Sequence, residues 1–451
     1  MRFFFRYFDT VILIILNFLF LILLIEMNIR LDSDFLSIKK NYLYISFLIL
    51  INFFYYFHKL RILNYNIFFI YLILVFFNFF IKSDHFGTSG YLSNLEYAEK
   101  KGIKFDNRTK LQFYEDIKMT KNISSTITNW DVNQYLSQHK DSNQNLFPIS
   151  NGISDLDAVY CNEDGKWQFL YLDKYGFPNK NNIYVKNKYY DIILLGDSFT
   201  KGSCVDLDKR PANILQERFN LDVLNLANAG GFLSSYAAYK EYGVNFNSKY
   251  VILNFYEGND YSDTLTELNT YLSRYLEKDY NQNLIERQSE TNKLYEKILF
   301  QSLNEIKKKK ISKTIKFISL YNLNTLFKKI LVNIKLNYFS KKKISAVNEI
   351  SRIIDNMNEL VIKNNSKLII NILPTWDRYY LNDSKNENYK SIKQFKEIFE
   401  SKNITYLDMN EFILQRIEEP KTLYLFDRFN HFDEGGYLLM SEFIFKNLFD
   451  D

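Results

Sequence analysis

The sequence contains the stretch Ile192-Ile193-Leu194-Leu195-Gly196-Asp197-Ser198-Phe199-Thr200, in which four apolar residues lead directly into a glycine, an acid and a serine. An unbroken apolar run is typical of a strand that is buried on both faces of a parallel sheet. In open α/β sheets, reactive groups gather just beyond the carboxyl ends of such strands. The stretch therefore predicts a strand that ends at Leu195 and a nucleophile at Ser198.

Other apolar runs predict the remaining strands of the same sheet. They lie within 223–231 and at 250–255, 367–372 and 404–408. Helices are predicted between them, at 205–220 and 232–247. Strands that alternate with helices indicate a parallel sheet, so the predicted fold class is α/β, a three-layer α/β/α sandwich. Lys-rich amphipathic stretches at about 262–364 interrupt the alternation, either as a lid over the site or as a docking surface.

The glycine, aspartate and serine of the first stretch do not form the Gly-x-Ser-x-Gly elbow of the α/β-hydrolases, because Thr200 stands where the second glycine would be. Together with Phe199, Thr200 and Gly202 they resemble the first block of the SGNH (GDSL-type) hydrolases. The triplet alone is also typical of a helix N-cap, so the other blocks carry the resemblance. These follow in the family's order at Val223–Gly231, Glu257–Asp260 and Asn430–Tyr437. The resemblance extends from about Cys161 to the C-terminus and implies the SGNH fold.

The resemblance also implies a role in acyl transfer for four residues. Ser198 is the nucleophile, and His431 is the base that takes its proton, since an unperturbed imidazole titrates near pH ~6.5. The backbone N–H groups of Ser198 and Gly230 and the side-chain amide of Asn259 form the oxyanion hole. One donor of this kind stabilises the transition state by roughly 3–4 kcal/mol.

The third member of the triad departs from the family pattern. The family commonly has an aspartate three residues before the histidine, but that position here is Arg428, and the nearest upstream acid is Asp427. We therefore predict Asp427 as the acid, reaching His431 from a bulged turn. The alternative is a backbone carbonyl that orients His431 and leaves a Ser–His dyad.

The two cysteines, Cys161 and Cys204, and the four histidines show no zinc-ligand spacing, so no metal is expected. Related sequences carry a similar Cys-Asn-Glu segment and a cysteine near the serine block. This resemblance implies a Cys161–Cys204 disulfide in an oxidising compartment, and two buried free thiols are the alternative. The chain has neither a Walker loop nor a Rossmann glycine pattern, so no cofactor is expected. A net charge of +5 over 451 residues does not predict binding to nucleic acid.

Three strongly apolar stretches precede the catalytic region, at 9–27, 43–57 and 62–81. The first and the last are close to the ~20 residues that cross a bilayer as a helix. The middle one is short, and a run of that length is also typical of a buried core helix. Basic residues before the first stretch and between the second and third favour the cytoplasm. Three spans then put residues 83–451 outside, whereas two would leave the catalytic domain in the cytoplasm.

These patterns predict a membrane anchor over 1–82, a polar linker or cap over 83–150 and an SGNH hydrolase-like domain over 151–451. We expect a serine esterase or O-acyltransferase of the bacterial inner membrane that faces the periplasm or exterior. The resemblance implies an acylated polysaccharide or glycolipid as substrate. A transferase would need a partner acyltransferase or polysaccharide-export protein, because three spans are too few for an acyl channel. A membrane-anchored lipase or thioesterase and a non-catalytic glycan-assembly module are the alternatives.

Overall fold

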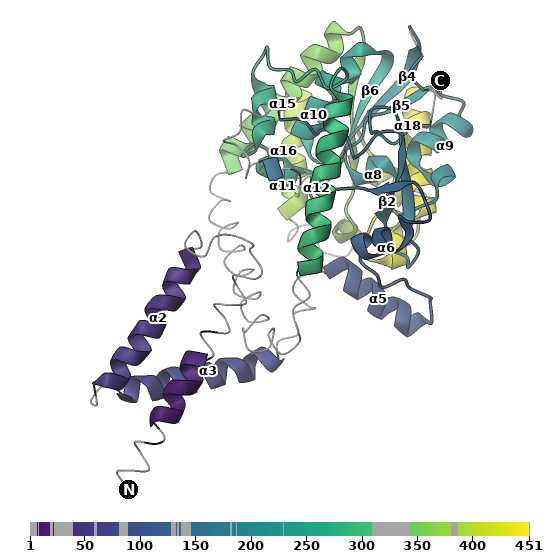
Figure 1. Cartoon of the computed structure of the whole chain (residues 1–451). Coiled ribbons are helices and arrows are strands. Elements are labelled where there is room, and N and C mark those ends of the chain that lie inside the picture. Colours follow the sequence, from purple (N-terminus) through teal and green to yellow (C-terminus); the bar gives the residue numbers. More distant parts are fainter. Residues whose placement is uncertain are drawn as a thin grey trace. The chain divides into compact units, whose positions relative to one another are not determined.

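The computed structural model of the chain divides into two compact units (Figure 1). One consists of Met1–Ser89 and Ser302–Ser340, and the other of Gly90–Gln301 and Lys341–Asp451. The structure describes residues 7, 9–18, 21, 39–57, 61–80, 89–127, 132, 135–136, 146–180, 183–185, 187–228, 230–308, 343–379 and 387–450.

The described part of the first unit includes two long apolar helices, α2 (Lys39–Tyr56) and α3 (Arg61–Phe80). They pack with the helical residues 9–18 around a small core of Ile12, Leu16 and Ile51. The predicted spans 43–57 and 62–81 fall largely on these helices. Most of the first predicted span beyond residue 18 lies outside the described residues. Among the helices that are described, none combines the length and the apolar character that crossing a membrane requires.

The second unit is built on a five-stranded sheet in the order β5-β4-β6-β7-β8. Its strands are β4 (Tyr189–Leu195), β5 (Val223–Asn225), β6 (Asn247–Tyr256), β7 (Lys367–Leu373) and β8 (Thr405–Asp408). All neighbouring pairs are parallel, and Leu194 of β4 lies opposite Asn225 of β5 and Ile252 of β6. A strand is present at each predicted place, so the predicted α/β class with a parallel sheet is confirmed.

Alternate residues of the strands enter two separate hydrophobic cores. In β4, Ile193 and Leu195 belong to one core, and Ile192 and Leu194 belong to the other. The first core lies under α10 (Phe232–Glu241), α15 (Lys343–Lys363) and α16 (Glu387–Ser401), and the second under α9 (Pro211–Glu217), α17 (Met409–Leu414) and α18 (Glu434–Leu448) (Figure 1). Burial on both faces explains why the strand sequences are apolar without alternation. The sheet and its two helical layers form a three-layer α/β/α sandwich.

A three-stranded sheet precedes the sandwich in the chain. Its strands are β1 (Ile123–Ser125), β2 (Leu156–Cys161) and β3 (Gln168–Leu172); β1 runs parallel to β2, and β2 antiparallel to β3. Helices α5 (Ser89–Lys101) and α6 (Lys110–Ile117) come before it, and Thr109 starts α6 with a capping box. The segment 83–150, for which we predict a linker or cap, thus contributes two helices and a strand to the second unit.

The predicted insertion at about 262–364 supplies α11 (Asp260–Glu267), the 3₁₀ turn η5 (Tyr271–Leu276), α12 (Gln288–Lys308) and α15. Residues 309–342 lie outside the described part. The buried side chains of α15 include Ile353, Met357 and Val361, which belong to the first core of the sandwich. The end of this insertion therefore forms part of a helical layer. The remaining short turns are η3 (Leu207–Lys209), η4 (Gly243–Asn245), η7 (Trp376–Tyr379), η9 (Pro420–Leu423) and η10 (Leu425–Asp427).

Candidate active site

Ser198 is the first residue of the short helix α8 (Ser198–Lys201), directly beyond the carboxyl end of β4. The turn between strand and helix depends on Gly196, whose φ of +137° lies in a region that favours glycine. A Cβ at this position would lie 2.3 Å from Thr200 Oγ1. Asp197 then caps α8 by accepting a backbone hydrogen bond of 2.9 Å. The local sequence thereby places a half-buried serine hydroxyl at the edge of the sheet.

His431 reaches Ser198 from the loop before α18. Its Nε2 lies 2.8 Å from Ser198 Oγ, a hydrogen-bond distance that suits proton transfer. The His431 carbonyl accepts the N–H of Leu425 at 2.9 Å, and the Asp433 N–H donates to Leu423 O at 2.9 Å. These backbone bonds close the loop on both sides of the histidine. The structure thus brings together the nucleophile and the base that the sequence predicts, across 233 positions of the chain.

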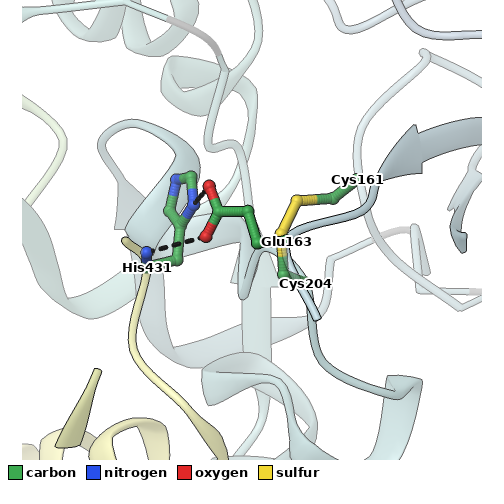
Figure 2. A group of neighbouring side chains, drawn as sticks. All are labelled: Cys161, Glu163, Cys204 and His431. Carbon is green, nitrogen blue, oxygen red and sulfur yellow. Dashed lines mark hydrogen bonds and ion pairs between the residues drawn. A yellow bond between two sulfur atoms is a disulfide. The ribbon is translucent and has the colours of Figure 1, made fainter. Parts of the chain in front are cut away.

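The carboxylate that orients His431 belongs to Glu163 (Figure 2). Glu163 Oε1 lies 2.8 Å from His431 Nδ1, and Glu163 Oε2 accepts the backbone N–H of the same histidine at 2.9 Å. Glu163 stands in the turn between β2 and β3, so the acid comes from the small sheet and not from the sandwich. One carboxylate therefore fixes both the ring and the backbone of the base.

Asp427, the predicted acid, takes no part in this arrangement. It ends η10 with a φ of +52°, and its carbonyl accepts the Trp376 Nε1–H at 3.1 Å. Asp427 and His431 both belong to the described part of the chain, and no hydrogen bond joins them there. The prediction of Asp427 as the acid is therefore corrected. Asp427 lies in the tight turn of η10, and Glu163 already binds the imidazole of His431. Glu163 belongs to the segment Cys161-Asn162-Glu163. The similarity of this segment to related sequences predicts only the disulfide and not the acid.

The electrostatics of the pair match the roles of base and orienting acid. Burial would lower the pKa of His431, but the charge of Glu163 and its hydrogen bond outweigh burial and raise the pKa above the ordinary histidine value. Burial would likewise raise the pKa of Glu163, but His431 lowers it through its charge and two hydrogen bonds. Glu163 therefore stays ionised at neutral pH and stabilises the imidazolium that forms when Ser198 loses its proton.

These shifts predict the acid limb of the pH–rate profile. Only neutral His431 accepts a proton, so kcat/KM is expected to rise with pH and to reach half its plateau above the ordinary pKa of histidine. In a Glu163→Gln variant the charge that raises the pKa is gone, so the midpoint should move to lower pH. The measurement is kcat/KM for a small ester across the pH range with both proteins. A midpoint that is the same in both would contradict the assignment.

Of the three predicted oxyanion donors, Ser198 begins α8, and Gly230 and Asn259 lie just before α10 and α11. Asn259 directly precedes α11, and its Nδ2 donates one hydrogen to Asp263 Oδ2 at 2.6 Å. An amide nitrogen carries two hydrogens, so the second remains for a substrate oxyanion. Gly230 is buried just before α10, and a Cβ on it would lie 2.2 Å from Glu267 Oε1. Glu267 also accepts the N–H of Gly231 at 2.9 Å, so α11 holds the turn that carries Gly230.

Replacing Asn259 with alanine is expected to lower kcat by about 10²–10³-fold, the effect of losing one oxyanion donor. KM should change little, because this amide acts on the charge that develops in the transition state. Steady-state kinetics on an activated ester measures both constants. Ser262→Ala is the matched control, since its exposed hydroxyl on α11 donates only to the Asn259 carbonyl. An equal loss of kcat in both variants would show a structural effect of the helix instead.

Cys161 and Cys204 are joined by a disulfide, with their Cα atoms 5.1 Å apart. Their sulfur atoms and one ligand atom each of Glu163 and His431 all lie within 4.8 Å of one another (Figure 2). The four residue types are those of a metal site, but disulfide sulfurs are not thiolate ligands, and Glu163 already holds the His431 ring. The cluster as it stands is therefore a disulfide beside the hydrogen-bonded pair Glu163 and His431.

A buried asparagine pair supports the histidine loop from outside the sandwich. Asn94 of α5 and Asn430 exchange hydrogen bonds of 3.0 and 3.1 Å through their side-chain amides. Asn430 Nδ2 also donates to Leu425 O at 2.8 Å. Next to this pair, the rings of Tyr97 and Phe426 lie with centroids 5.0 Å apart. Helix α5 thus packs on the loop that ends in His431.

Replacing Asn94 with alanine is expected to lower the free energy of unfolding by about 1–3 kcal/mol, because Asn430 is left buried with unpaired groups. Denaturant unfolding of the variant beside wild type measures the difference. Glu99→Ala, an exposed change on the same helix, is the control and should shift stability by no more than about 0.5 kcal/mol. Equal effects of the two changes would mean that the asparagine pair adds nothing specific.

Comparisons with known proteins give distant structural likenesses. No protein-family model matches the chain, and no curated protein is similar to it in sequence. Among solved structures, it is similar to a lipolytic G-D-S-L family member from Veillonella parvula at 13% identity and a TM-score of 0.32, covering 57% of this chain and 97% of that one. A putative lipolytic G-D-S-L family protein from Desulfitobacterium hafniense shares 15% identity at a TM-score of 0.31, covering 56% and 96%. A GDSL-like lipase from Bacteroides thetaiotaomicron shares 14% at 0.30, covering 58% and 88%.

The family assignment draws on the blocks of the sequence and on the site that they build. Gly196-Asp197-Ser198 ends a central parallel strand, and His431 opens the last helical segment with its Nε2 on the Ser198 hydroxyl. Gly230 and Asn259 lie just before the two helices that follow the neighbouring strands. By these blocks and by their arrangement around Ser198, the chain resembles the SGNH (GDSL-type) hydrolases.

Proposed function

We propose that the protein is a serine esterase or O-acyltransferase that works through an acyl-Ser198 intermediate on ester groups of an extracytoplasmic polysaccharide or glycolipid. The observation that carries the chemistry is the continuous chain of hydrogen bonds from Ser198 Oγ through His431 to Glu163, with 2.8 Å at each step. A serine hydroxyl becomes nucleophilic when a positioned base takes its proton, and an orienting acid stabilises the charged base.

The reaction follows from these positions. Ser198 Oγ attacks the carbonyl carbon of the ester while its proton moves to His431 Nε2. The N–H groups of Ser198 and Gly230 and the Asn259 amide hold the oxyanion. The tetrahedral intermediate collapses, the C–O bond to the leaving alcohol breaks, and His431 returns the proton to that alcohol. His431 then takes a proton from water or a sugar hydroxyl, whose oxygen attacks the acyl carbon. The bond from this carbon to Ser198 Oγ breaks, His431 returns the proton to Ser198 Oγ, and the free acid or a new ester is released.

Two features support a site of action outside the cytoplasm and at a membrane. The Cys161–Cys204 disulfide is of a kind that persists in oxidising compartments. Helix α3 leaves many large apolar side chains exposed: Ile62, Phe69, Ile70, Ile73, Phe76 and Phe77. An exposed apolar surface of this kind is typical of contact with lipid or with another protein. We propose that the first unit attaches the enzyme to the inner membrane, beside a partner that delivers acyl groups or exports the glycan.

A serine-reactive fluorophosphonate probe tests the catalytic part of the proposal. Wild-type full-length protein is expected to form a covalent adduct on Ser198, while Ser198→Ala should not be labelled. Peptide mass spectrometry identifies the modified residue, and circular dichroism shows that both proteins are folded. A folded wild-type protein that is not labelled at Ser198 would overturn the enzymatic function and favour a non-catalytic glycan-assembly role.

A panel of esters tests the substrate class. O-acetylated oligosaccharides are expected to be better substrates than long-chain fatty acyl esters or thioesters. Adding an unacetylated oligosaccharide as acceptor separates transfer from hydrolysis, because a transferase forms acetylated acceptor and releases less free acetate. A clear preference for long-chain esters would contradict the glycan assignment and identify a lipase or thioesterase.

A further inference from the structure

The catalytic groups come from two different sheets. Ser198 and His431 lie at the carboxyl edge of the five-stranded sheet, whereas Glu163 follows β2 of the small sheet. The noncovalent contacts between these parts include the hydrogen bond of Tyr160 with Ser203 and a contact from Arg210 to Phe169 O. Besides the backbone itself, the Cys161–Cys204 disulfide links them covalently.

The two ends of this disulfide are close to the reacting groups. Cys161 lies two residues before Glu163, and Cys204 lies six residues after Ser198. On the Cys204 side, Ser203 Oγ donates to the Ser198 carbonyl at 2.8 Å. The disulfide sulfurs and the ligand atoms of Glu163 and His431 lie within 4.8 Å of one another (Figure 2). A movement of the Cys161 segment therefore passes almost directly to the carboxylate of Glu163.

Cys204 is held in a backbone conformation that a cysteine rarely adopts. Its φ is +65°, and it is almost fully buried. A non-glycine residue in the left-handed region stores strain that the surrounding structure must hold in place. Breaking the sulfur–sulfur bond removes one of the restraints that hold it, so the loop after α8 is expected to relax. This relaxation separates the Cys204 side from the turn that carries Glu163.

We infer that the Cys161–Cys204 disulfide is a positioning element of the triad, which holds the Glu163 carboxylate on His431, so that reduction of this bond lowers catalysis. The inference rests on the proposed function. A dithiol reductant supplies the two electrons and two protons: the disulfide becomes two thiols, and the reductant becomes a cyclic disulfide. Glu163 is then displaced from its fixed place on His431, and the imidazole is oriented less well. Activity is thereby coupled to the thiol redox state of the compartment.

The first test compares oxidised protein, protein treated with dithiothreitol, and the double variant Cys161→Ser/Cys204→Ser, all as the full chain. Because the sequence has only two cysteines, any effect of the reductant on the protein acts through this bond. Reduction and the double variant are each expected to lower kcat by about 10²-fold, the cost of displacing a catalytic group by about 1 Å. KM should stay within about twofold, since the substrate-binding surface is not altered. Reoxidation should restore the wild-type rate, and the double variant should not respond to the reductant.

The second test separates positioning from loss of fold. In a Glu163→Gln background, reduction is expected to cause little further loss of kcat, because the carboxylate that the disulfide positions is already absent. In wild type, proton NMR should show a downfield signal from His431 Nδ1–H on Glu163, and this signal should disappear on reduction. The inference would be overturned if reduction lowered kcat equally in wild type and in Glu163→Gln. It would also be overturned if wild type kept full activity after a thiol assay had shown that both cysteines were reduced. If the proposed function itself were wrong, the result would differ: oxidised wild-type protein would then not be labelled at Ser198 by the fluorophosphonate probe.

Discussion

Replacing Glu163 with glutamine is expected to lower kcat by about 10⁴-fold, the loss seen when the orienting acid of a serine triad becomes an amide. Glutamine keeps the size of the side chain but removes the charge that stabilises the His431 imidazolium. It also offers an N–H₂ group that favours the wrong tautomer of the ring. The substitution therefore affects the transition state and leaves substrate binding nearly unchanged. Steady-state kinetics on an activated ester would show a fall in kcat with a similar KM.

Asp427→Asn is the matched control for this experiment, because it makes the same chemical change at the nearest acid upstream of His431. Its kcat should stay within about twofold of wild type. In the structure, the backbone carbonyl of Asp427 accepts a hydrogen bond from Trp376 Nε1–H, and Asp427→Asn preserves this bond. A large loss in Asp427→Asn together with a small loss in Glu163→Gln would contradict the triad described here.

Replacing Ser198 or His431 alone with alanine is expected to lower kcat by about 10⁶-fold, and the double variant should lose no more than either single one. The reason is that the two side chains perform one step. Without the serine there is no hydroxyl to deprotonate, and without the histidine the hydroxyl keeps its proton. Their 2.8 Å contact means that neither acts independently.

The test is a double-mutant cycle. The kcat of wild type and of all three variants is measured with the same ester, at substrate concentrations well above KM. Mass spectrometry should detect acyl-enzyme on wild type and not on either variant lacking Ser198. The rate that the variants keep above the uncatalysed reaction measures the contribution of the oxyanion donors and of substrate binding. Losses that multiply in the double variant would mean that Ser198 and His431 act in separate steps, which contradicts the mechanism.

The sequence was sufficient to predict the parallel sheet and the place of Ser198 from local pattern, whereas the role of His431 was implied by the resemblance to the SGNH hydrolases. A strand buried on both faces must be apolar throughout, and a serine that ends it needs Gly196 for the turn. The helix predicted over 205–220 is shorter in the structure, since α9 begins at Pro211, a residue that favours the first position of a helix. The elements were thus predictable in kind and order, but not at every boundary.

The acid was not predictable by the same reasoning, because nothing local marks it. Glu163 is 268 residues from His431 and lies in a turn of a separate sheet. A search for an acid near the histidine finds Asp427, which lies in a tight turn with its carbonyl bound to Trp376. Only the three-dimensional packing of the small sheet against the sandwich brings the glutamate to the imidazole. Proximity in sequence is therefore a poor guide to this member of the triad.

The Asn94–Asn430 pair has a consequence for the design of shorter recombinant fragments. A fragment that begins at residue 151, where the hydrolase-like sequence starts, would lack α5 and leave Asn430 without its buried partner. The residue after Asn430 is His431, so the damage would fall on the catalytic base itself. Such a fragment would keep all four sequence blocks that resemble the SGNH hydrolases, and its activity would still be impaired. Recombinant fragments for assays or crystallisation should therefore start at or before Ser89, the first residue of α5.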